Sequence, residues 1–139
     1  MADRELITVG WLERISLPDW GIDRLVAKID TGAKTSAIHA ENIEELEGDR
    51  VKFEVITSRS AKAKPTVIET DIARKTIVRS SSGKAQTRYV VKTTLCMSGV
   101  CRKIEITLSS RKRMSRRMLV GRTTLAGNFI VDASQTHLS

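Results

Sequence analysis

The sequence contains few aromatic residues and no long apolar run. Aromatic residues make up only 4% of the 139 positions, so a core drawn from the 40% hydrophobic residues must be mainly aliphatic. No segment reaches the roughly 20 apolar residues that a membrane helix needs. The charged N-terminus also differs from a secretory signal, whose central region is apolar. We therefore expect a soluble, cytoplasmic protein that has no membrane partner.

The motifs of common metal and nucleotide sites are also missing. The sequence contains no His-Glu-x-x-His zinc motif and no Gly-x-x-x-x-Gly-Lys-Ser/Thr phosphate loop. Its two histidines are His39 and His137, and its two cysteines, Cys96 and Cys101, are too few for a structural zinc. We expect neither a metal nor a cofactor. The two cysteines flank a predicted hairpin loop. Because a cytosol would keep them reduced, we expect free thiols on strand residues, and a disulfide between them is the less favoured alternative.

The remaining pattern consists of short apolar runs separated by Gly, Ser and Asp, which is typical of strands. Little of the chain has a helical pattern, apart from Arg122 to Gly127. The acidic segment from Glu41 to Arg50 is interpreted as a loop. These features predict an all-β fold, a barrel or sandwich, in a single domain spanning 1–139 with a core at about 7–133.

The charge balance is basic, with 24 Lys and Arg against 16 Asp and Glu and a net charge of +8. This excess favours an anionic partner such as an acidic peptide, a ribosomal surface or nucleic acid, although from charge alone a solvated surface with a basic bias is the favoured explanation. Few aromatics are interleaved with the cations, so we do not expect a nucleic-acid stacking surface.

One short segment has the pattern of a reactive site. Leu25, Ala27 and Ile29 lie on one face of a predicted strand that ends in Asp30-Thr31-Gly32. A glycine after such a carboxylate allows a close backbone approach, because it has no Cβ. Asp and Gly also mark many ordinary turns, so this motif has little weight alone. A second segment near the C-terminus, Leu119-Val120-Gly121-Arg122, strengthens the motif as an indication of a catalytic site.

Together the two segments resemble the catalytic and supporting segments of retroviral-type aspartic peptidases. The chain as a whole is similar, over roughly 9–132, to the bacterial family labelled "ATP-dependent zinc protease", or RimK-associated retropepsin-like proteins. The matching segments are 9–11, 28–40, 78–83 and 118–123. The resemblance implies a closed retropepsin-like barrel with one short helix near the C-terminus. The sequence lacks the motifs that the zinc and ATP of that label would need.

The resemblance also assigns roles to individual residues. Asp30 would be the catalytic carboxylate, supported by six neighbours: Thr31, Gly32, Ala33, Ser36, Gly121 and Arg122. An aspartic peptidase needs two such carboxyl groups, but this sequence has one Asp-Thr-Gly and no internal repeat. A homodimer would supply the second. Lys34 stands where retropepsins carry the acidic partner of Arg122, which removes an expected salt bridge.

Two further elements are candidates for substrate binding. The predicted hairpin from Val78 to Thr87 lies between the two motifs, as a retropepsin flap does, and an ordinary polar hairpin is the alternative. The residues at its tip would face the substrate: Ser80, Ser81, Ser82 and Gly83. His39 would either orient a substrate or serve as a hydrogen-bonded structural histidine, and we slightly favour the structural role.

Two hypotheses of function follow. The first is a homodimeric aspartic endopeptidase that cleaves peptide or protein substrates, acidic or glutamate-tailed ones among them, beside a RimK-type glutamate ligase system. The second is a non-catalytic module that uses its basic surface to dock a glutamate ligase, a ribosomal protein or RNA. The Asp30 motif favours the first hypothesis.

Overall fold

The computed structural model describes residues 5–57, 64–79, 82–110 and 116–138. Its strands are β1 (Ile7–Val9), β2 (Leu12–Leu17), β3 (Ile22–Ile29), β4 (Ser36–Leu46), β5 (Arg50–Val55), β6 (Thr66–Arg79), β7 (Ala85–Met97), β8 (Val100–Ser109), β9 (Met118–Val120) and β10 (Phe129–Val131). A 3-10 turn, η1 (Pro18–Trp20), and a helix, α1 (Arg122–Leu125), complete these elements. The prediction of an all-β fold with one short helix near the C-terminus is confirmed.

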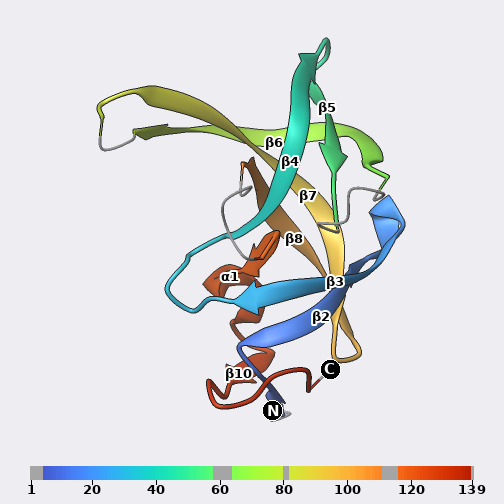
Figure 1. Ribbon diagram of the computed structural model, residues 1–139, viewed down its shortest axis with the longest axis vertical. Coiled ribbons are helices and arrows are strands. Elements are labelled where there is room, and N and C mark those ends of the chain that lie inside the picture. Colours follow the sequence, from blue (N-terminus) through green and yellow to red (C-terminus); the bar gives the residue numbers. More distant parts are fainter. Residues whose placement is uncertain (1–4, 58–63, 80–81, 111–115, 139) are drawn as a thin grey trace.

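Eight strands form one sheet in the order β2-β3-β9-β4-β5-β6-β7-β8. Additional β2–β7 and β4–β8 pairings make this sheet turn back on itself around the core. Most neighbours are antiparallel, as in the β6–β7 hairpin (Figure 1). By contrast, β9 lies parallel to β3 and antiparallel to β4. A C-terminal strand therefore sits between two strands from the first third of the chain. β1 and β10 form a separate parallel pair.

The core follows from the alternation of apolar and polar residues along the strands. In β3, Leu25, Ala27 and Ile29 are buried on one face, as predicted. The core is mostly aliphatic. Its aromatic contact is an edge-to-face pair of Trp20 and Phe53, whose ring centroids lie 5.4 Å apart. Aliphatic β-branched side chains suit a pleated surface that packs on one side.

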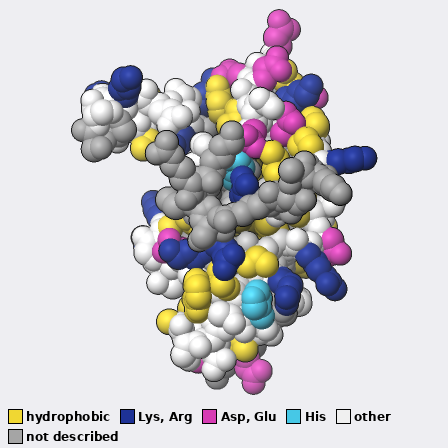
Figure 2. Space-filling model, in the orientation of Figure 1, with side chains coloured by type: hydrophobic (Ala, Val, Ile, Leu, Met, Phe, Trp, Pro, Cys, Tyr) yellow, Lys and Arg dark blue, Asp and Glu magenta, His cyan; other side chains and the backbone are white. Residues whose placement is uncertain are grey.

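The interpretation of Glu41 to Arg50 as a loop was wrong for most of its length. β4 continues to Leu46 and pairs with β5, with a register shift between Glu41 and Glu44. The side chains of Glu44 and Glu45 are exposed in this part of β4, so the charge did not prevent strand formation. Figure 2 shows acidic side chains gathered at the top of the view, over the β4–β5 hairpin.

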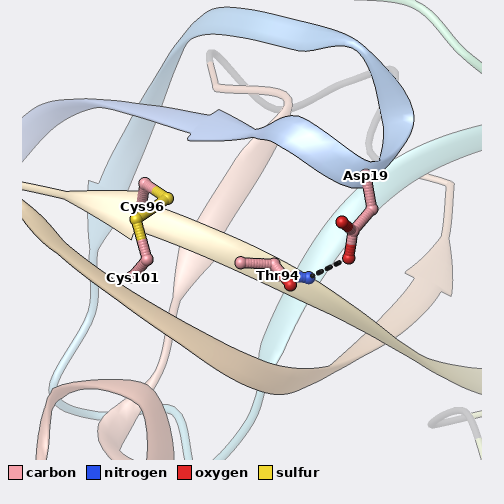
Figure 3. Close-up of a disulfide and its surroundings, with 4 residues drawn as sticks. All are labelled: Asp19, Thr94, Cys96 and Cys101. Carbon is pink, nitrogen blue, oxygen red and sulfur yellow. Dashed lines mark hydrogen bonds between the residues drawn. A yellow bond between two sulfur atoms is a disulfide. The ribbon is translucent and has the colours of Figure 1, made fainter.

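The expectation of reduced thiols was also wrong, because a disulfide joins Cys96 and Cys101 (Figure 3). The two cysteines are direct cross-strand partners in the β7–β8 hairpin, with their Cα atoms 4.0 Å apart. Beside them, the Thr94 amide donates to the Asp19 carboxylate at 3.2 Å, which ties η1 to β7.

No helix in the described part of the chain is both long enough and apolar enough to cross a membrane.

Candidate functional site

Asp30 lies at the end of two buried parallel strands. β3 and β9 are in register from Ala27 opposite Met118 to Ile29 opposite Val120. The Asp30 amide extends this ladder by donating to the Val120 carbonyl at 2.9 Å. Apolar side chains on both strands are buried, so the strand ends are fixed by packing as well as by hydrogen bonds. The half-buried Asp30 carboxylate therefore projects from a rigid platform.

The turn after Asp30 closes on its own carboxylate. The Gly32 amide donates to Asp30 Oδ1 at 2.9 Å, and the Ala33 amide donates to the Asp30 carbonyl at 3.2 Å. A Cβ on Gly32 would stand 3.2 Å from the same Oδ1, which is closer than most side chains lie. Glycine is therefore the residue that lets this amide reach the carboxylate. This backbone donor orients the Asp30 carboxylate.

The two sequence motifs meet directly at Gly121. Its amide donates to Ser36 Oγ at 3.1 Å, and Ser36 Oγ forms a second hydrogen bond with Thr124 Oγ1 at 2.9 Å. A Cβ on Gly121 would lie 2.6 Å from the Thr35 carbonyl carbon and oxygen, so a side chain cannot fit. Ser36 and Thr124 are both buried, which makes their mutual hydrogen bond the means of satisfying both hydroxyls.

The start of α1 is attached to the Asp30 turn. The Arg122 and Thr123 amides donate to the carbonyls of Ala33 and Lys34, at 2.8 and 3.0 Å. The Arg122 side chain also returns to the turn, where Nη1 donates to the Thr31 carbonyl at 3.0 Å. With Lys34 in place of the acidic residue, the arginine therefore binds a backbone carbonyl instead. All six supporting residues named from the sequence lie in this assembly around Asp30.

The β6–β7 hairpin extends from the body of the molecule (Figure 1). Its strands are paired out to Arg79 and Ala85. Of the predicted tip residues, Ser82 and Gly83 are exposed, whereas Ser80 and Ser81 lie outside the described residues. The hairpin occupies the place in the chain predicted for the flap.

A cavity of about 310 Å³ lies between the base of this hairpin and the Asp30 turn. It is lined by Lys34, Thr35, Ala37, Arg74, Thr76, Val78, Arg88 and Thr107. Three of these residues are cations and none is acidic, and although Arg74 pairs with Glu105 at 3.1 Å, Lys34 and Arg88 make the lining suited to an anionic group. Sequence analysis missed Arg74 and Arg88. The alternation of Arg74, Thr76 and Val78 along β6 was visible in the sequence, but only the pairing of Thr76 with Arg88 brings β7 to the same face.

His39 is placed differently from the other predicted residues. It is fully buried in β4, its amide donates to the Arg117 carbonyl at 2.7 Å, and its Nε2 lies 3.3 Å from Glu41 Oε2. These contacts involve β4 and the segment before β9, and His39 does not line the cavity described above.

Zinc-binding side chains do not gather around Asp30 in the described part of the chain. Among the described residues, no group of three or more His, Cys, Asp or Glu is placed to hold a metal ion. Asp30 therefore has no set of zinc ligands around it among the described residues. These residues do not fit the zinc of the family label.

Comparisons with known proteins identify the family and support the fold. A family described as "RimB-like: Retropepsin-like aspartic endopeptidase RimB" matches residues 8–139. A protein of unknown function (DUF785) from Legionella pneumophila has a crystal structure that superposes with a TM-score of 0.79 and 28% identity. That match covers 96% of this chain and 98% of the other.

Two curated relatives carry the name "Probable alpha-L-glutamate ligase". The one from Desulfotalea psychrophila is 38% identical over 127 residues, which is 89% of this chain and 27% of the relative. The one from Parasynechococcus marenigrum is 35% identical over 134 residues, which is 94% of this chain and 29% of the relative. The chain therefore spans less than a third of the length of these relatives.

Proposed function

Because the chain belongs to the RimB-like family of retropepsin-like aspartic endopeptidases, we propose that two copies of it form an endopeptidase in which each supplies one Asp30 carboxyl group. The observation that carries this proposal is the fixing of Asp30 at the end of the β3–β9 ladder by the Val120 carbonyl and the Gly32 amide. A carboxylate held this way on a rigid strand end is oriented before substrate arrives.

The chemistry follows from two like charges held close together. Two such carboxyl groups share one proton, because both cannot ionise comfortably at short range. The ionised Asp30 takes a proton from water as the water oxygen attacks the scissile carbonyl carbon, and the protonated Asp30 donates to the carbonyl oxygen. The Asp30 that took the water proton then gives it to the amide nitrogen, the other Asp30 takes a proton back from a hydroxyl of the tetrahedral carbon, and the C–N bond breaks to release the two peptide products.

The second copy is required by the number of motifs. The sequence has one Asp-Thr-Gly, and a two-fold axis beside Asp30 brings the same turn against itself. Thr31 is exposed at this turn and would brace it against the other copy, and the exposed Gly32 would contact the substrate backbone. The β6–β7 hairpin would cover the bound peptide and exclude water.

The substrates we propose are acidic peptides or glutamate-tailed proteins. The cavity beside the Asp30 turn is lined by Lys34, Arg74 and Arg88, of which Arg74 also pairs with Glu105 from outside the lining. The net charge of +8 adds long-range attraction for such chains. Relatives that contain a similar segment within a much longer chain are named as glutamate ligases. We therefore place this protein beside a RimK-type ligase system.

The decisive experiment compares Asp30→Asn with Asp23→Asn, a matched change at an exposed aspartate of β3, the strand that leads to Asp30. Cleavage of glutamate-rich peptides should be lost with Asp30→Asn and kept with Asp23→Asn. Specific activity should also fall on dilution, in step with dimer dissociation measured by sedimentation equilibrium. Cleavage that persists with Asp30→Asn would exclude the aspartic mechanism. A well-folded wild type that binds acidic peptides without cleaving them would favour the non-catalytic module.

The substrate proposal has its own test. Arg88→Gln should raise the KM for a glutamate-rich peptide more than for its glutamine counterpart, because the lost cation faces the cavity. Lys92→Gln is the control, since Lys92 is an exposed cation on the same strand outside that cavity. Equal effects on both peptides would argue against recognition of acidic side chains by this cavity.

A further inference from the structure

Arg102 connects a distant strand to the helix that supports the Asp30 turn. It is half-buried in β8, and its Nη1 donates to the Thr124 carbonyl at 2.8 Å and to the Ala126 carbonyl at 3.2 Å. These are carbonyls at the C-terminal end of α1, where a cation is electrostatically favourable. Hydrogen bonds from a guanidinium are also stronger than those between neutral groups.

The helix that receives these bonds depends on such external contacts. α1 has four residues, and its N-cap residue Gly121 supplies no side-chain hydrogen bond. A helix of one turn does not persist on its own, because nucleation costs more than a single turn returns. The position of α1 is therefore set by the elements that hold its two ends.

At its other end, α1 is bonded to the catalytic turn. The amides of Arg122 and Thr123 donate to Ala33 and Lys34, and the Arg122 guanidinium donates to Thr31. Thr124 is held from two sides, with its carbonyl bound by Arg102 and its hydroxyl bound by Ser36. Arg102, α1 and residues 31–34 thus form one continuous chain of hydrogen bonds.

We propose that Arg102 is a positioning residue for catalysis, which holds α1 from β8 and thereby sets the placement of the Asp30 turn. This inference rests on the proposed peptidase function. In a dimer, a small shift of the turn changes the separation of the two carboxyl groups. Such a shift affects the chemical step more than peptide binding, because two of the three cavity cations, Arg74 and Arg88, lie on β6 and β7 and not on the turn.

The kinetic test uses Arg102→Gln, Arg102→Lys and Lys103→Gln. Lys103 is the matched control, since it is the next residue of β8, is mostly exposed and lies on the opposite face of the strand. Arg102→Gln should lower kcat by about tenfold with little change in KM, and should shift the pH–rate profile. Arg102→Lys should recover part of kcat, because an ammonium still donates to carbonyls. Lys103→Gln should match the wild type.

A second measurement keeps the inference separate from the proposed function. Hydrogen exchange of the Ala33, Arg122 and Thr123 amides reports the coupling directly, whether or not the protein cleaves peptides. These amides should exchange faster in Arg102→Gln and keep the wild-type rate in Lys103→Gln. If Arg102→Gln does not fold, Arg102→Lys should give a smaller change in the same direction.

The outcomes are distinguishable. A wild type without peptidase activity, in which Arg102→Gln still accelerates exchange at these amides, would overturn the proposed function and leave the coupling intact. Variants that lose only thermal stability, with unchanged kcat and unchanged exchange at these three amides, would show a merely structural arginine and overturn the inference.

Discussion

The guanidinium of Arg122 donates to the backbone carbonyl of Thr31 at 3.0 Å, so a cation from the C-terminal part of the chain holds the peptide unit beside Asp30. The two residues are separated by 91 positions in sequence. Their contact explains how the turn tolerates Lys34, since the arginine binds a carbonyl and needs no carboxylate there. The brace thus joins the two segments that the sequence marks as functional.

Removing this brace should affect activity more than stability. Arg122 is exposed, so water replaces much of the lost hydrogen bond in Arg122→Ala, and we expect a loss of less than about 1 kcal/mol in unfolding free energy. Peptidase activity should fall by a larger factor, because the turn bearing Asp30 loses a fixed contact. Chemical denaturation and kcat/KM measure the two effects. Arg24→Ala, at an exposed arginine of β3, is the control. Equal activity in the two variants would contradict the role given to Arg122.

The hydroxyl pair behind the turn should behave as a coupled unit. Ser36→Ala leaves the buried Gly121 amide and the Thr124 hydroxyl without this partner, which should cost about 1–3 kcal/mol. In a double-mutant cycle with Thr124→Val, we expect a coupling energy of at least about 0.5 kcal/mol from urea unfolding. Thr87→Ala, at an exposed position of β7, should change little. If the free-energy losses of Ser36→Ala and Thr124→Val simply add, the hydrogen bond between the two hydroxyls contributes no coupling energy to stability.

A charged cluster at the base of the β6–β7 hairpin should give a measurable pH dependence. Glu45 accepts from Lys75 at 2.8 Å and from Tyr89 at 3.0 Å. The hydrogen bond from Lys75, and then that from Tyr89, lowers the pKa of Glu45. The hydrogen bond to Glu45 likewise raises the pKa of Lys75 and the pKa of Tyr89.

The signs of these shifts define a pH window. The lowered pKa of Glu45 means that its contribution is present above the usual glutamate value of about 4.3 and is lost as pH falls through the lowered pKa. The raised pKa of Lys75 means that its contribution is present below about 10.4 and is lost as pH rises through the raised pKa. The cluster is therefore complete between these limits.

Tyr89 provides the measurement, because it is the single tyrosine of the chain. In an ultraviolet titration it should ionise above the usual pKa of about 10, and Glu45→Gln should bring the pKa back towards that value. Glu44→Gln, which alters the preceding exposed carboxylate, should leave the titration unchanged. A Tyr89 pKa that does not respond to Glu45→Gln would rule out this contact in solution.

Reduction of the Cys96–Cys101 disulfide should destabilise the protein moderately. The loop that it closes is short, with a sequence separation of five, so the chain-entropy estimate is only about 2 kcal/mol. Cys101 is exposed, which gives reductants access. Urea unfolding with and without a thiol reductant measures the effect, and Cys96→Ser with Cys101→Ser should reproduce the reduced protein. An unchanged unfolding midpoint in all three samples would show that β-pairing alone holds this hairpin.

Local sequence determined the elements that carry the candidate site. The alternation of Leu25, Ala27 and Ile29 predicted a strand ending at Asp30, and the apolar run before Gly121 predicted the strand that became β9. Both predictions succeeded because strand periodicity and glycine turns depend on neighbouring residues alone. The resemblance to a known family then indicated that the two segments belong to one site, which periodicity could not reveal.

Tertiary structure decided which distant residues meet. The strand partners of β4 made residues 41–46 extended although their sequence is acidic and loop-like. The register of β7 against β8 placed Cys96 opposite Cys101. The cations of the cavity come from separate elements, and Arg102 reaches α1 from across the fold. Each of these contacts depends on how strands far apart in sequence align, and side-chain patterns along one strand do not encode that alignment.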